Sequence, residues 1–133
     1  MIRAIVIGLG NMGLSHALAL HAAEEVEVVA LVNRSPRTLP KELKNYQFLS
    51  DIDEAFALSP NLVVIATYSE SHAPLAIRAM ESGAHVFVEK PLATTVADAR
   101  AVVDTAGRLN RKLVVGYILR HHPSWQRLIA EAR

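Results

Sequence analysis

Three glycines, at positions 8, 10 and 13, constrain the fold of this chain more than any other feature of its sequence. They follow an apolar run, Ile2–Ile7, that is typical of a strand buried on both faces. A stretch of good helix formers, from about Met12 to His21, comes next. The first glycine permits a tight turn, the second lets the backbone approach a pyrophosphate, and the third allows close packing of helix on strand. The pattern predicts a phosphate-binding turn whose contacts are Gly8, Leu9, Gly10, Asn11, Met12 and Gly13.

A glycine-rich turn without a ligand is the alternative interpretation of this motif. The strand before it and the helix after it favour the binding turn, because the motif requires that context. The N-terminus of the helix would also present free N–H groups and a positive dipole end to phosphates.

Apolar runs alternate with helical patterns along the rest of the chain, which is typical of a parallel sheet with helices on both faces. Further strands are expected at Val26–Val32, Tyr46–Leu49, Leu62–Ala66, His85–Val88 and Leu113–Gly116. Further helices are expected at about Lys41–Lys44, after Asp51, at Glu70–Ser82 with Gly83 as its end, from Thr94 or Thr95 to about Ala106 with Gly107 as its end, and from Pro123 to Arg133. The fold class is therefore α/β, a doubly wound Rossmann sheet of about six strands in the order 3-2-1-4-5-6.

Composition excludes several classes of protein. The 133 residues are 51% apolar and contain no cysteine, so disulfide frameworks and thiolate metal sites are absent. The 14 basic and 13 acidic residues nearly balance, so the chain lacks the basic excess that is typical of nucleic-acid-binding domains. No apolar run approaches the roughly 20 residues of a membrane span, and we expect a cytoplasmic location.

The end of the second strand carries a basic turn. Asn33 is followed by Arg34, Ser35 and Arg37, with no carboxylate before Glu42. An acid at this position would bind a ribose 2′-hydroxyl and repel a 2′-phosphate. Two guanidiniums and a hydroxyl form a good phosphate cradle, so the turn predicts NADP in preference to NAD. A solvated basic loop is the alternative.

Three more motifs follow strands four, five and six, at the edge where open α/β sheets bind ligands. They are Thr67-Tyr68 with His72, then Glu89-Lys90-Pro91, and then Gly116-Tyr117 with Arg120 and Pro123. With the glycine turn, they make the chain resemble the N-terminal domain of the glucose–fructose oxidoreductase and inositol dehydrogenase family (Gfo/Idh/MocA). The resemblance covers essentially the whole chain.

The resemblance implies roles for these residues. Lys90 would be the catalytic lysine, whose ammonium donates to the reacting oxygen and whose pKa burial can lower. Glu89 would contact the cofactor and orient the lysine. Thr67, Tyr68 and His72 would line the cofactor cleft, with Tyr117 and Arg120 at its floor. Tyr68 stands where the family commonly has proline, which puts the contact of that loop in doubt.

The expected function is hydride transfer between NADP(H) and a sugar, polyol or related hydroxy or keto compound, with residues 1–120 as the cofactor domain. Residues 121–133 would begin the connection to a second domain, absent here, that supplies substrate contacts and any homo-oligomer interface. This chain alone would then be inactive. The alternative is a non-catalytic NADP-sensing module, since fold alone does not separate the two.

No metal site is expected. Adjacent histidines such as His121 and His122 diverge on a regular element, and no acidic cluster accompanies them. His16 and His21, both in the first helix, are interpreted as surface or packing residues.

Overall fold

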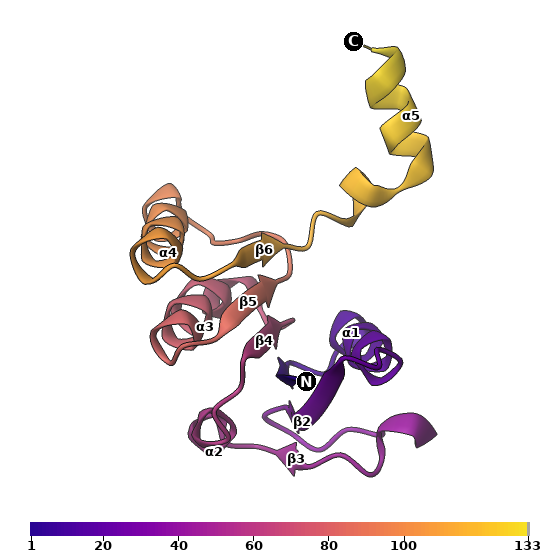
Figure 1. Cartoon of the computed structure of the whole chain (residues 1–133), viewed down its shortest axis with the longest axis vertical. Helices are drawn as coiled ribbons and strands as arrows, with labels where there is room; N and C mark the ends of the chain where they lie inside the picture. The colour runs from indigo at the N-terminus through magenta and orange to yellow at the C-terminus, as the bar shows by residue number, and fades with distance from the viewer. Residues whose placement is uncertain (133) are drawn as a thin grey trace.

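A six-stranded sheet forms the centre of the molecule in the computed structural model, which describes residues 1–132 (Figure 1). The strands are β1 (Ile2–Ile7), β2 (Val26–Val32), β3 (Phe48–Leu49), β4 (Leu62–Ile65), β5 (His85–Val88) and β6 (Leu113–Val115). The helices are α1 (Asn11–His21), α2 (Ile52–Ala57), α3 (Ser69–Glu81), α4 (Val96–Leu109) and α5 (Pro123–Glu131), with 3-10 turns η1 (Lys41–Leu43) and η2 (Ile118–His121).

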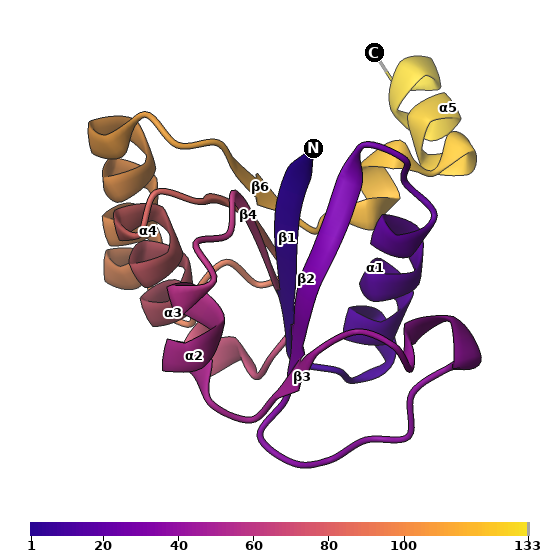
Figure 2. The same cartoon turned by 60° about the horizontal axis from the view of Figure 1, so that its bottom comes forward.

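The order of the strands is β3-β2-β1-β4-β5-β6 and every pairing is parallel, which confirms the predicted doubly wound sheet. Helix α1 lies on one face, and α2, α3 and α4 lie on the other (Figure 2). Each face has its own apolar core, and alternate residues of one strand supply the two cores. Val6 of β1 packs with Leu9 and Ala17 on the α1 side, while Ile5 and Ile7 face the other helices.

Several element ends differ from the sequence prediction, most clearly those of α4 and β3. Helix α4 does not end at Gly107: it continues to Leu109, and Asn110 takes the left-handed conformation with φ 51° instead. The prediction was wrong because asparagine also tolerates that conformation, while a glycine inside a helix costs only about 1 kcal/mol. Strand β3 is confined to Phe48–Leu49, since only these residues pair with β2. Gly83, with φ +97°, does end α3 as predicted.

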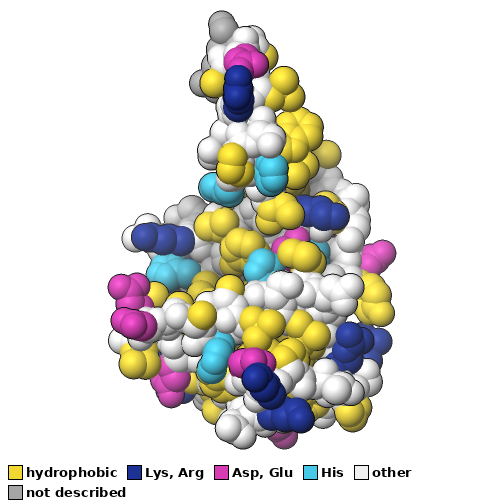
Figure 3. All heavy atoms as spheres, turned by 90° about the vertical axis from the view of Figure 1, so that its right-hand side faces the viewer, with side chains coloured by type: hydrophobic (Ala, Val, Ile, Leu, Met, Phe, Trp, Pro, Cys, Tyr) yellow, Lys and Arg dark blue, Asp and Glu magenta, His cyan; other side chains and the backbone are white. Residues whose placement is uncertain are grey.

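The segment after β6 leaves the body of the molecule. Helix α5 has no buried residue and projects away from the sheet (Figure 1). Apolar side chains lie along it and on the neighbouring surface (Figure 3); the most exposed of these near the end of the chain are Tyr117, Ile118, Leu119, Trp125, Leu128 and Ile129. Among residues 1–132, no helix is long and apolar enough to cross a membrane.

Candidate functional site

All strands run in the same direction, so their carboxyl ends lie at one edge of the sheet. The glycine turn follows β1, Asn33 follows β2, Thr67 comes just after β4, and Glu89 follows β5. A cleft of about 700 Å³ lies at this edge. Of the residues predicted from the sequence, those that line it are Gly8, Leu9, Gly10, Asn33, Arg34, Ser35, Arg37, Thr67 and Tyr68.

The three glycines have different surroundings. Gly8 has φ +90°, and a Cβ there would overlap the carbonyl oxygen of Ala66. A Cβ at Gly13 would overlap the carbonyl oxygen of Gly8, so this glycine allows α1 to lie close against the turn. Gly10 has no atom within 4 Å of the position of a Cβ. The first and third glycines therefore satisfy the needs of the fold itself, while the space at Gly10 is open.

Two of the helices that begin at the cleft lack a side-chain cap. Helices α2, α4 and α5 are capped by Asp51, Thr95 and His122, whereas no side chain caps α1 at Gly10 or α3 at Tyr68. Gly10 and Tyr68 both line the cleft. Free backbone donors and the positive end of the helix dipole therefore point to a site for an anionic group beside Gly10.

Asn33 connects the glycine turn to the basic turn. Its Oδ1 accepts a 3.0 Å hydrogen bond from the backbone N–H of Leu9, and its Nδ2 donates to the carbonyl oxygen of Ser35 at 2.8 Å. The side chains of Arg34 and Arg37 are exposed, and within residues 1–132 no carboxylate lies in ion-pairing distance of either. The two guanidiniums are therefore available to an anion in the cleft.

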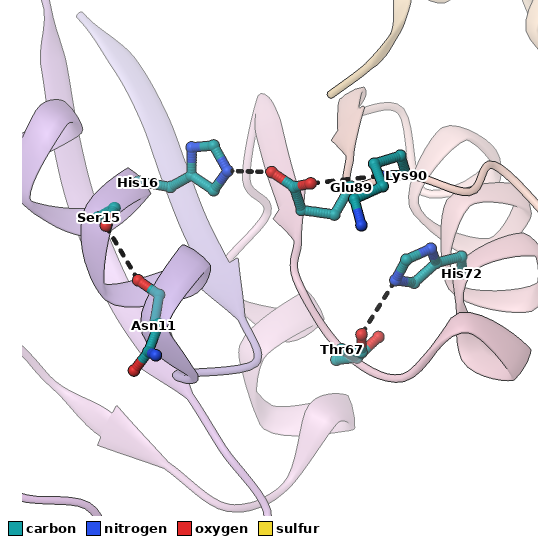
Figure 4. Close-up of polar contacts among 7 residues, drawn as sticks. All are labelled: Asn11, Ser15, His16, Thr67, His72, Glu89 and Lys90. Carbon is teal, nitrogen blue, oxygen red and sulfur yellow. Dashed lines mark hydrogen bonds and ion pairs between the residues drawn. The ribbon is translucent and has the colours of Figure 1, made fainter. Parts of the chain in front are cut away.

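His72 lies beneath the cleft rather than on its lining. Its side chain is 1% exposed, with Nε2 3.1 Å from the carbonyl oxygen of Thr67 and Nδ1 2.7 Å from that of Pro91 (Figure 4). The ring thus connects the loop after β4 to the loop after β5. Thr67 also exchanges a 2.6 Å hydrogen bond with Ser71, which holds the same loop against α3.

Glu89 and Lys90 lie beside the cleft. Glu89 is 7% exposed, and its Oε1 lies 2.7 Å from Nε2 of His16 on α1. Lys90 is exposed, so the burial expected for its side chain is not found in this chain. The Lys90–Pro91 peptide bond is cis. Figure 4 shows the Lys90 side chain between Glu89 and His72.

The remaining predicted contacts lie outside the lining of the cleft. Asn11 and Met12 are exposed in the first turn of α1. Tyr117 and Arg120 are exposed after β6, with the guanidinium of Arg120 5.9 Å from the centre of the Tyr117 ring. The cleft therefore gathers predicted residues that follow β1, β2 and β4, and none of those that follow β5 or β6.

The sequence analysis missed several residues of the cleft. One face of α3 contributes Ser71, Pro74, Leu75 and Arg78, whose spacing of three and four residues is that of a helix face. Ser50 and Ile52 close the opposite wall. The spacing along α3 was the available signal, once this helix was expected to begin at the binding edge. Arg78 pairs with Asp53 and lies 4.6 Å over the ring of Phe56.

The residues present suit a dinucleotide. The volume of the cleft falls within the roughly 300–1,000 Å³ of small-molecule sites. Open space at Gly10 and the uncapped start of α1 fit a pyrophosphate. The free Arg34 and Arg37 fit a further anionic group at the β2 end. Among residues 1–132, no three histidine or carboxylate side chains are grouped to hold a metal ion.

Comparisons with known proteins agree with this geometry. The sequence model of the family GFO_IDH_MocA, described as an oxidoreductase family with an NAD-binding Rossmann fold, matches residues 2–117. A curated relative from Shewanella pealeana, named glycosyl hydrolase family 109 protein, is 33% identical over 128 residues. That match takes in 86% of this chain but only 28% of the relative.

Solved structures give the same result. GenD2 from gentamicin A biosynthesis, in complex with NAD, has a TM-score of 0.87 at 29% identity; the match covers 95% of this chain and 37% of GenD2. UDP-N-acetylglucosamine 3-dehydrogenase GnnA from Acidithiobacillus ferrooxidans has a TM-score of 0.85 at 26% identity, over 98% of this chain and 43% of that protein. The chain thus spans well under half the length of these proteins, and across nearly all its residues it matches their NAD-binding part. It belongs to the Gfo/Idh/MocA oxidoreductase family and forms its NAD-binding Rossmann domain.

Proposed function

We propose that the chain binds NADP(H) in preference to NAD(H), as the cofactor domain of a longer dehydrogenase or reductase. The observation that carries this proposal is the shared edge of the sheet. There, an uncapped helix start and two arginines without a carboxylate partner among residues 1–132 line one cleft, and the Glu89-Lys90 pair follows β5 at the same edge.

The pyrophosphate would lie against the backbone N–H groups at the start of α1, because Gly10 leaves space for it. The adenosine end would extend toward β2, where Arg34, Ser35 and Arg37 would contact the 2′-phosphate. Asn33 would keep that turn in place through its bonds to Leu9 and Ser35. The nicotinamide would then point toward β4 and β5, beside Thr67 and Lys90.

The bound cofactor would supply hydride transfer, and the protein would orient the reactants and stabilise charge. In this role Lys90 donates a hydrogen bond from its ammonium to the substrate oxygen that gains or loses a proton. Its exposed side chain is free to reach a substrate placed over the nicotinamide. Sugars and polyols are the proposed substrate class, supported by a relative whose name is UDP-N-acetylglucosamine 3-dehydrogenase.

The remaining catalytic groups and substrate contacts would come from a second domain, for which residues 121–133 begin the connection. The support is the difference in length: the match spans 37% of GenD2 and 43% of GnnA. Hydride transfer needs reacting atoms about 3–3.5 Å apart, which one wall of a cleft does not secure. This domain alone would therefore be inactive, and any homo-oligomer would form through the second domain. The cytoplasm is the proposed location, on the sequence grounds given above.

Glycoside hydrolysis is a second candidate, because the curated relative from Shewanella pealeana carries a glycosyl hydrolase name. NAD-dependent glycosidases use the same cofactor without net consumption. The two candidates therefore share the cofactor site described here and differ in the net reaction.

The test is turnover by the whole protein in the presence of NADP⁺ and candidate sugars. A dehydrogenase accumulates NADPH, seen at 340 nm. A glycosidase releases the aglycone and accumulates no NADPH. Lys90→Ala should lower kcat strongly and leave the Kd for NADPH within about threefold. Full activity of this variant would remove Lys90 from the chemistry, and cofactor binding with no turnover on any sugar or polyol would favour the sensing module.

A further inference from the structure

His16 lies where α1 meets the strand that carries the catalytic motif. It is on the second turn of the helix that begins at the glycine turn, three residues after Gly13. Its ring contacts Phe87 of β5 edge to face, with the centroids 4.8 Å apart, and its Nε2 lies 2.7 Å from the carboxylate of Glu89. The side chain is 20% exposed. The ring of His16 is thus held by two defined contacts, which a solvent-exposed surface residue would not need.

Both carboxylate oxygens of Glu89 accept a hydrogen bond within this chain. Oε1 accepts from Nε2 of His16, and Oε2 accepts from the backbone N–H of Lys90 at 3.3 Å. On its third side lies Gly116, where a Cβ would come within 3.0 Å of Oε1. The two hydrogen bonds thus hold the carboxylate between His16 of α1 and the backbone of Lys90, with little space on the side of Gly116.

These contacts join two elements of the binding edge through residues that are 73 positions apart in sequence. One is the helix whose N-terminus would hold the pyrophosphate, and the other is the loop that carries Lys90 (Figure 4). The hydrogen bond between them is charge-assisted and mostly shielded from water, since Glu89 is 7% exposed. The hydrogen bond is therefore a direct connection between the position of α1 and that of the Lys90 loop.

We propose that His16 is a positioning residue for the nicotinamide end of the cofactor site: through Glu89 it sets the distance between the phosphate-binding helix and the Lys90 loop. This inference rests on the proposed function. Under it, Glu89 acts through His16 and the backbone of Lys90, and makes no contact of its own with the cofactor. The adenosine end, at Asn33–Arg37, does not depend on this connection.

Two matched substitutions separate the hydrogen bond from the packing on Phe87. His16→Leu keeps an apolar side chain of similar size against Phe87 but has no donor. His16→Gln keeps a donor that can reach Glu89. His21→Leu, on the same helix, is the control, because His21 bonds Tyr46 away from the cleft. Glu89→Ala and the double variant His16→Leu/Glu89→Ala complete a mutant cycle.

The affinity of each variant of this chain is measured by calorimetry for two ligands, NADPH and 2′-phospho-ADP-ribose, which lacks the nicotinamide. If NADH binds more tightly, NADH and ADP-ribose replace them. His16→Leu and Glu89→Ala should each weaken the dinucleotide about tenfold, which is about 1.4 kcal/mol. The truncated ligand should change less than twofold, His16→Gln should restore affinity to within about threefold, and the double variant should lose no more than either single variant.

Parallel losses for both ligands would show a general structural role and overturn the proposal. So would unchanged dinucleotide affinity in His16→Leu, or additive losses in the double variant. If His16→Leu does not fold by circular dichroism, the comparison of His16→Gln with Glu89→Ala decides the same question. A native chain that binds no nicotinamide dinucleotide would instead overturn the proposed function on which this inference rests.

Discussion

Gly10 and Gly13 are three positions apart, and their surroundings restrict a side chain in different ways. A side chain at Gly13 would meet the backbone of Gly8, so the fold itself requires glycine there. A side chain at Gly10 would meet nothing within 4 Å, and the backbone at this position is extended, with φ −71° and ψ −170°. Under the proposed function, the need for glycine at position 10 would come from the ligand.

Gly10→Val tests this difference directly. The branched side chain should fill the space at the start of α1, so NADPH binding should fall below detection in a calorimetric titration. The midpoint of thermal unfolding should change by less than about 5 °C, because a poorer N-cap costs at most about 1 kcal/mol. The matched variant Gly13→Val should unfold at a much lower temperature. Normal NADPH affinity in folded Gly10→Val would contradict the proposed pyrophosphate position.

Arg34 carries the proposed choice between the two dinucleotides. Its guanidinium is exposed and unpaired, so replacing it should leave the fold intact. Arg34→Ala should weaken NADPH about tenfold to a hundredfold, as expected for a hydrogen bond to a charged group. NADH, which has no 2′-phosphate, should bind this variant as it binds the native chain. An equal loss for both dinucleotides would assign Arg34 to another part of the site.

At the scale of elements, the helices divide by how they begin. In the three that start with a capping side chain, α2, α4 and α5, that side chain accepts a hydrogen bond from one backbone N–H of the first turn. The two without one, α1 and α3, begin at the cleft, with Gly10 and Tyr68 among its lining residues. Helix α2 also begins at the cleft, through Ile52, so of the three helix starts there it is α1 and α3 that keep backbone donors free of a side-chain cap.

Helix α4 offers a test of how its end is specified. Since the helix passes through Gly107 and ends at Asn110, a glycine at position 107 weakens it. A Cβ at Gly107 would meet nothing within 4 Å, so Gly107→Ala should stabilise the chain by about 0.5–1 kcal/mol in chemical unfolding. Asn110→Ala should destabilise it, because alanine is strained at φ 51°. Destabilisation by Gly107→Ala would mean that the helix ends at Gly107 after all.

At the scale of the whole molecule, the strands could be predicted from the sequence because apolar runs and glycine turns are local signals. Their alternation with helical patterns then indicated the doubly wound order of the sheet. The strand boundaries at Val26–Val32 and His85–Val88 were correct to the residue. The roles of side chains at the binding edge depended instead on contacts between distant elements. His16 was interpreted as a surface or packing residue, and nothing in its local sequence shows that Glu89 lies 2.7 Å away.

The same limit applies to His72. The family resemblance implied that it lines the cleft, but it is buried between the carbonyl oxygens of Thr67 and Pro91. Only the packing of two loops determines which side of the loop this ring occupies. The basic turn at Arg34 and Arg37, by contrast, could be found from the sequence, because it follows its strand directly and no partner competes for it.

A calorimetric titration of this chain with NADPH and with NADH tests the central claim most directly, when combined with amide hydrogen exchange of the complex. We expect one dinucleotide per chain and a lower Kd for NADPH. Amides of residues 8–14 and 33–37 should be protected in the complex, because the pyrophosphate and the 2′-phosphate would contact them. Absence of binding, or protection confined to other parts of the chain, would contradict the cofactor site described here. Equal affinities, or tighter binding of NADH, would contradict the 2′-phosphate cradle.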